Sequence, residues 1–98
     1  MPVEREVIRR NITSKGFLHE PNADHDYYYL YHNRKKTNLW IRLSRGSKYK
    51  VYSDDLLGRQ SKILGVSISD LRKFVTCLYS QEEFIQILIR NGKLRPYQ

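Results

Sequence analysis

The sequence has few of the residues from which metal and covalent-catalysis motifs are built. Cys77 is the single cysteine in 98 residues, so the chain can form no internal disulfide and offers no C-x-x-C pair for zinc. Within the apolar segment FVTCL, we expect this thiol to be buried and structural. The chain has no Gly-x-Ser-x-Gly motif and no glycine-rich phosphate loop, and its Asp, Glu and His residues lack metal-ligand spacing. We therefore expect neither a cofactor nor a metal.

Long apolar segments are also missing. No run approaches the ~20 apolar residues that span a bilayer. The first ten residues, MPVEREVIRR, carry charges where a signal peptide needs an apolar stretch. These two absences predict a cytoplasmic protein without membrane association.

Acidic residues are in the minority. The chain has 18 Lys and Arg against 10 Asp and Glu, a formal net charge of +8. Such a charge attracts nucleic acid, an anionic membrane surface or an acidic protein. A membrane-surface helix carries its basic residues opposite a strong apolar face, whereas the densest cations here lie in a predicted strand. Nucleic acid is therefore the favoured partner, and a basic surface that serves only solubility is the alternative.

The periodicity of apolar residues predicts a single α+β domain over residues 1–98. A helix is expected over residues 3–15, with Gly16 ending it, and strands over 17–20, 25–32 and 39–44. Residues 33–38 have polar turn character, and residues 45–53 form a loop with the option of a further short strand. A helix over 54–64 completes a two-layer α-β-β-β-α core over residues 3–64, with a three-stranded antiparallel sheet.

Two more helices form a predicted C-terminal extension over residues 67–92. Ser67-x-x-Asp70 and Ser80-x-x-Glu83 resemble helix starts, the second being a capping box. The apolar rows of these helices need a partner. They can extend the main core, pack as a helical hairpin beside it, or join a second copy of the chain. These rows are expected to contain Leu71, Phe74, Val75, Leu78, Phe84, Ile85, Leu88 and Ile89.

Aromatic and basic residues are concentrated between His25 and Tyr52. Most of the eight tyrosines and the only tryptophan lie here. A period of two divides the strand residues between two faces. The set expected to face the helices is Tyr28, Leu30, His32, Leu39, Ile41 and Leu43. The set expected on the open face is Tyr27, Tyr29, Tyr31, Trp40 and Arg42. Exposed rings among cations can stack nucleobases while Lys and Arg neutralise phosphates. Alternatively, the tyrosines serve only as good strand formers.

Two further groups of residues are candidates for contacts with nucleic acid. Six cations form a predicted phosphate-gripping rim, the first three at a hairpin tip: Arg34, Lys35, Lys36, Arg45, Lys48 and Lys50. His25 opens the aromatic strand between Asp24 and Asp26. Histidine suits proton transfer near neutral pH, so His25 is the candidate general base. His19 is expected to be structural, and His32, which ends its strand, has the alternative of facing solvent.

The order of these features resembles the HicA toxins. A first helix ends in Lys15-Gly16-Phe17, a histidine leads the aromatic strand HDYYYLYH, and a hairpin and a helix follow. The resemblance covers about residues 3–64. It implies a double-stranded-RNA-binding-domain-like fold, mRNA interferase activity, a HicB-like antitoxin partner and an essential histidine at His25. In the family that histidine usually follows Gly-Ser, whereas Ala23-Asp24 precede it here, and the two C-terminal helices have no counterpart in compact members.

Three hypotheses about function follow. In the first, the chain is a metal-independent endoribonuclease with His25 as base and Arg42, Arg45 or Lys48 stabilising the phosphoryl charge. In the second, the same surface binds RNA or DNA without catalysis. In the third, the basic aromatic face binds an acidic protein, as a regulator or an inhibitor would.

Overall fold

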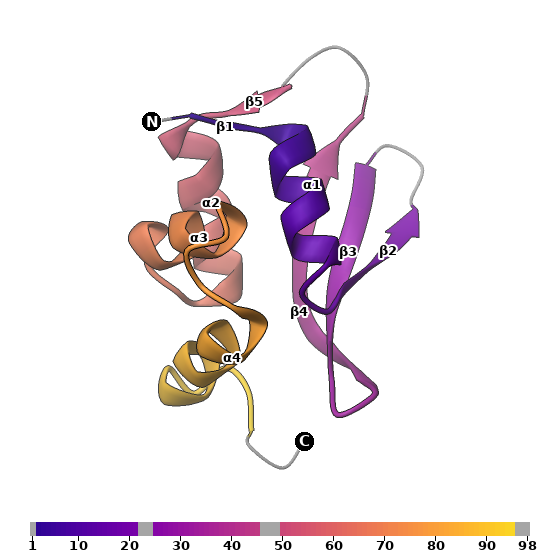
Figure 1. Ribbon diagram of the computed structural model, residues 1–98, viewed down its shortest axis with the longest axis vertical. Helices are drawn as coiled ribbons and strands as arrows, with labels where there is room; N and C mark the ends of the chain where they lie inside the picture. Colours follow the sequence, from indigo (N-terminus) through magenta and orange to yellow (C-terminus); the bar gives the residue numbers. More distant parts are fainter. Residues whose placement is uncertain (1, 22–24, 46–49, 96–98) are drawn as a thin grey trace.

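The computed structural model describes residues 2–21, 25–45 and 50–95, and these form the predicted α+β fold. Along the chain, the strands and helices are β1 (Val3–Glu4), α1 (Arg5–Thr13), β2 (Phe17–Pro21), β3 (His25–His32), β4 (Lys35–Ser44), β5 (Val51–Tyr52), α2 (Asp54–Leu64), α3 (Ile68–Val75) and α4 (Gln81–Arg90). β2, β3 and β4 form an antiparallel sheet in that order. The helices lie on one side of this sheet, where α1 packs against both β2 and α3 while α2 contacts β4 (Figure 1).

The first helix begins at Arg5 rather than at the predicted Val3. Val3 and Glu4 instead pair with Tyr52 and Val51, so β1 and β5 make a separate two-stranded ribbon. This pairing buries the Val3 side chain, which in a longer helix would have joined the apolar row of α1. The optional short strand after residue 44 is therefore present, and its partner is the start of the chain.

The β3–β4 hairpin is tighter than the predicted turn over residues 33–38. Only Asn33 and Arg34 form the turn, with φ of 52° and 65°, the backbone of a two-residue hairpin connection. The register of β3 on β4 shifts between Tyr29 and Tyr31. Tyr29 pairs with Trp40, whereas Tyr31 pairs with Lys36. The Thr37 hydroxyl fills this irregularity by donating to the Leu30 carbonyl (2.7 Å) and accepting from the Leu39 N–H (3.2 Å). β4 thus begins at Lys35, and Lys35 and Lys36 are strand residues rather than tip residues.

The core confirms the predicted division of the sheet into two faces. Tyr28, Leu30, Leu39, Ile41 and Leu43 are all buried against the helices. His32, predicted to share their face, lies at the end of β3 and is only half-buried.

The C-terminal helices extend this same core. The ring of Phe74 in α3 lies 5.6 Å from that of Phe17 in β2 and stacks at 4.0 Å on Phe84 in α4. Two predictions for this region were wrong. α3 ends at Val75, so Leu78 lies outside the apolar row and is 71% exposed, and Cys77 is exposed rather than buried. Among the described residues, no helix is long and apolar enough to cross a membrane.

Candidate nucleic-acid interface

The open face of the sheet carries a row of contacting aromatic rings. Tyr29 faces Trp40 across β3 and β4, and Tyr27 faces Arg42 in the same way. The Tyr27 ring centroid lies 5.1 Å from that of Trp40 and 6.4 Å from that of Tyr29. The three rings are half-buried and Arg42 is exposed, so the predicted placement of these side chains is confirmed. Tyr31 continues the row towards the hairpin and is also half-buried.

β2 adds two residues to this face that were not among the predicted site residues. Leu18 lies opposite Tyr29 and is half exposed, and Glu20 lies opposite Tyr27. The Glu20 carboxylate binds Lys36 Nζ at 2.6 Å, while that ammonium sits 4.1 Å from the centre of the Tyr29 ring. The hydrogen bond that Lys36 donates to the Glu20 carboxylate raises the pKa of Lys36. Lys36 is therefore already partnered by a carboxylate, unlike the phosphate-gripping residue that was predicted.

The predicted rim of six cations does not form a single group. Arg34 and Lys35 are exposed at the hairpin end of the sheet. Lys50 is exposed beside the β1–β5 ribbon, where its carbonyl accepts from the Arg5 N–H at 2.8 Å, and this ribbon lies at the other end of the molecule from the hairpin (Figure 1). Arg45 is bonded to Asp26. Lys48 lies outside the described residues.

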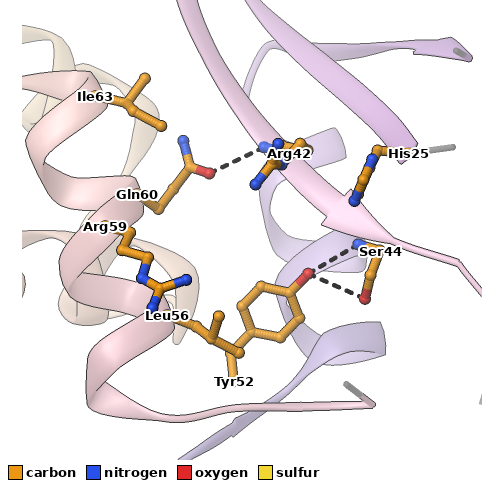
Figure 2. Close-up of a pocket in the computed structure, with 8 residues that line it drawn as sticks. All are labelled: His25, Arg42, Ser44, Tyr52, Leu56, Arg59, Gln60 and Ile63. Carbon is orange, nitrogen blue, oxygen red and sulfur yellow. Dashed lines mark hydrogen bonds between the residues drawn. The ribbon is translucent and has the colours of Figure 1, made fainter. Parts of the chain in front are cut away.

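A cavity of about 170 Å³ opens between the sheet and α2 and brings three nitrogen-rich side chains together (Figure 2). His25 comes from β3, Arg42 from β4 and Arg59 from α2. These three side chains have no hydrogen-bonding or ion-pairing partner in the described part of the chain, so their donors remain available to a ligand. Among the residues that the structure describes, the lining is His25, Arg42, Ser44, Tyr52, Leu56, Arg59, Gln60 and Ile63.

Hydrogen bonds to β4 hold the α2 wall of this cavity in place. The Gln60 side chain donates to the Trp40 carbonyl (2.7 Å) and accepts from the Arg42 N–H (3.0 Å), so it pairs with the outer edge of β4 as a neighbouring strand would. The Tyr52 hydroxyl accepts from the Ser44 N–H at 2.8 Å. Because buried amide groups are costly to leave unpaired, these contacts hold α2 beside β4, where Arg59 and Arg42 line the same cavity.

Asp26 forms a second cluster on the helix-facing side of the sheet. Its carboxylate contacts His19 Nε2 at 3.0 Å, Arg45 Nε at 2.9 Å and Arg9 at 3.7 Å. The His19 ring stacks on Tyr28 with centroids 5.0 Å apart. Arg45 also donates to the carbonyl of His25 at 3.4 Å. Asp26 therefore neighbours His25 in the chain without facing it, and instead secures the end of β3 from which His25 projects.

Acid is expected to weaken the fold through Asp26. Burial raises the pKa of this carboxyl, but hydrogen bonds from His19 and Arg45 and their charges outweigh burial and hold the pKa below its usual value. The ionised form is thus favoured by folding. Its contribution is present above the unfolded pKa of about 3.9 and is lost as the pH falls through the lower folded value.

Chemical unfolding of wild type and Asp26→Asn between about pH 6 and pH 2.5 measures this contribution. We expect the stability gap between the two proteins to shrink as the pH falls, because protonation removes from wild type what the substitution has already removed. Glu82→Gln, on the exposed start of α4, is the control that should leave the acid limb unchanged. A gap that stays constant over this range would contradict the role of Asp26.

Sequence reasoning missed Arg59, Gln60 and the His19–Asp26 pair. The described residues contain no group of three or more His, Cys, Asp or Glu placed to hold a metal ion. No family model, no curated protein and no solved structure matches this chain, so the resemblance to HicA toxins rests on the order of residues 3–64 alone.

Proposed function

We propose that this protein binds RNA through the open face of its three-stranded sheet. The observation that carries the proposal is the row of contacting rings of Tyr27, Tyr29 and Trp40 beside the exposed Arg42. Unstacked bases of a single strand pack on such rings at a gain of ~1–3 kcal/mol per base. Cations next to the rings neutralise the phosphates that follow those bases.

The charge of the whole chain supports a polyanionic partner. A net charge of +8 on 98 residues raises the local concentration of nucleic acid around the protein. The open face also contains the half-exposed Leu18, which widens the apolar area available to bases. The resemblance to HicA toxins favours RNA over DNA.

Salt dependence of binding tests this proposal. We expect the affinity for a fluorescently labelled single-stranded RNA to fall steeply between about 50 and 200 mM salt, because bound cations are released from the phosphates. Arg42→Ala should lower the magnitude of the log–log slope by roughly 0.7, the value of one phosphate contact on a single strand. Arg90→Ala, which removes an exposed cation at the end of α4, should leave the slope unchanged. Wild-type binding that ignores salt, or equal slopes for Arg42→Ala and wild type, would refute RNA binding by this face.

A second candidate function, RNA cleavage, is favoured by the position of His25 in the cavity. Its imidazole lies with Arg42 and Arg59 among the lining groups. His25 would take the proton of a ribose 2′-hydroxyl, whose oxygen attacks the adjacent phosphorus. The P–O5′ bond would then break, giving a 2′,3′-cyclic phosphate and a 5′-oxygen that takes its proton from water. The two guanidiniums would stabilise the negative charge that develops on the phosphoryl oxygens.

Incubation of purified protein with RNA in the presence of EDTA tests the cleavage function. Wild type should cut, and His25→Ala should cut at least 100-fold more slowly, within the ~10²–10⁴-fold range of general-base catalysis. His32→Ala is the matched control, because His32 lies at the other end of β3, and should cut normally. No cleavage by wild type, or equal cleavage by His25→Ala, would eliminate this function and leave RNA binding intact.

A further inference from the structure

The cavity beside the aromatic row has a composition that selects among phosphate groups. Arg42 and Arg59 supply two fixed positive charges, and His25 supplies a third when it is protonated. Its described lining contains no carboxylate. This distinguishes it from Lys36, which pairs with Glu20, and from Arg45, which pairs with Asp26. In the described part of the chain, the cavity is therefore a place where two guanidiniums line one hollow without a carboxylate beside them.

We propose that this cavity binds a terminal phosphate, a phosphomonoester whose nucleoside stacks its base on Tyr27 and Trp40. The inference rests on the proposed RNA-binding function and specifies which part of a nucleic acid the site prefers. A phosphodiester inside a strand carries one negative charge, whereas a phosphomonoester carries about 1.5 to 2 at neutral pH. Two guanidiniums and an imidazole match the charge of the phosphomonoester better than that of the phosphodiester.

The dimensions of the cavity fit a phosphate group. Its volume of about 170 Å³ is roughly five to six times the ~30 Å³ that one water molecule occupies in the liquid. Four phosphate oxygens around one phosphorus fit this space. Leu56 and Ile63 line the α2 side of the cavity and offer no donors. In the described lining, charged recognition therefore depends on His25, Arg42 and Arg59.

The aromatic row lies where the attached nucleoside would extend. Arg42 faces Tyr27 directly across the two strands, a relation that puts their Cβ atoms about 5 Å apart on the same face. His25 precedes Tyr27 by two residues in β3, which is about 7 Å along the strand. A phosphate between His25 and Arg42 is thus next to the Tyr27 and Trp40 rings, and its base can stack there.

The backbone that carries Arg59 is placed beside β4 before any ligand arrives. Its neighbour Gln60 is bonded to two backbone groups of β4, so the Arg59 backbone is fixed relative to Arg42. Guanidinium groups bind phosphate oxygens in pairs through two parallel N–H donors. Two such groups from opposite walls can together engage the three terminal oxygens that a phosphomonoester offers.

Paired ligands that differ only in the terminal phosphate test this inference. The RNAs are one short labelled sequence with a 5′-phosphate, a 3′-phosphate or hydroxyls at both ends, and the small ligands are adenosine monophosphate and adenosine. We expect wild type to bind a phosphorylated end about 10- to 100-fold more tightly than the hydroxyl-ended RNA, the range of one or two charge-assisted hydrogen bonds. Arg59→Ala should shrink this ratio at least fivefold, and Arg59→Lys should restore part of it. Arg90→Ala is the matched control and should keep the wild-type ratio.

The small ligands distinguish a free nucleotide from an RNA end. Adenosine monophosphate that binds as tightly as the phosphorylated RNA would identify a free mononucleotide as a ligand. A preference shown only by the RNAs would identify a strand end. Equal wild-type affinity for phosphorylated and hydroxyl-ended RNA would overturn the inference while leaving RNA binding standing, as would an unchanged ratio in folded Arg59→Ala. Absence of binding to either RNA would instead refute the proposed function.

Discussion

A chain that ends after Tyr79 is expected not to fold. Removal of α4 takes away Phe84, which stacks on Phe74 at 4.0 Å, and the buried side chains of Ile85, Ile87 and Leu88. Each such side chain contributes about 1.5–3 kcal/mol when buried. The four together contribute about 6–12 kcal/mol, which is comparable to the whole stability of a typical domain, about 5–15 kcal/mol.

Circular dichroism, thermal unfolding and size-exclusion chromatography of the truncated chain measure this effect. We expect loss of the cooperative transition and an aggregated or unfolded product. A chain that ends after Arg95 is the control, since it keeps every described helix and the buried Leu94. A truncated chain that remained folded and monomeric would show that α4 is an appendage to a core formed by residues 3–79.

The burial of α4 was predictable from its sequence, and so was its start. FIQILI is apolar around most of its circumference, which indicated burial. The capping box is present as predicted, because Ser80 accepts from the Glu83 N–H and the Glu83 carboxylate accepts from the Ser80 N–H. These signals are local: each depends on residues within one turn of a helix, so the sequence pattern contains all the information needed.

The departures from the predicted fold depend on distant partners. Val3 fits the apolar row of a helix, but its pairing with Tyr52 places it in a strand. The row of α3 was expected to reach Leu78, whereas the chain leaves the helix after Val75 and the next residues, Thr76 to Leu78, follow a different path. Cys77 has a φ of 66°, a left-handed backbone that sends the chain away from the core. Periodicity alone reveals neither the strand pairing of Val3 nor the end of α3 at Val75.

The candidate site likewise combines placements that follow from local sequence with placements that depend on distant partners. Alternation along β3 and β4 placed Tyr27, Tyr29, Trp40 and Arg42 on one face, because a strand has a fixed period of two. Arg59 was not predicted, because a lone arginine on a helix is indistinguishable in sequence from a solvated charge. Its place in the cavity depends on the docking of Gln60 onto the edge of β4, 18 to 20 residues earlier in the chain.

The number of cations in the sequence also exceeds the number available to bind phosphate, because carboxylates already engage some of them. Lys36 was expected to contact phosphate, but the register of β2 on β3 puts Glu20 within reach of its ammonium. Arg45 is similarly engaged by Asp26. Net charge alone predicts a polyanionic partner, whereas the distribution of carboxylates across the sheet determines which cations would remain available to such a partner.

Loss of Trp40 is expected to weaken the binding of single-stranded RNA by roughly 10- to 100-fold. The indole contacts Tyr27 and faces Tyr29, so its removal takes away the largest ring of the row and the support of a neighbour. Base stacking on one such ring is worth ~1–3 kcal/mol, which corresponds to this range. Tyr27→Ala should have a similar effect, and the combined substitution should cost less than the sum because the two rings contact one another.

Conservative and matched variants separate stacking from general damage to the surface. Trp40→Phe keeps an aromatic ring and should recover most of the affinity, whereas Trp40→Leu keeps apolar area without a π-face and should not. Leu78→Ala removes a side chain that is 71% exposed at a distant position and should bind RNA as wild type does. Thermal unfolding of each variant confirms that the sheet is intact. Wild-type affinity in folded Trp40→Ala would show that bases do not stack on this row, and the open face of the sheet would then have to be abandoned as the RNA-binding surface.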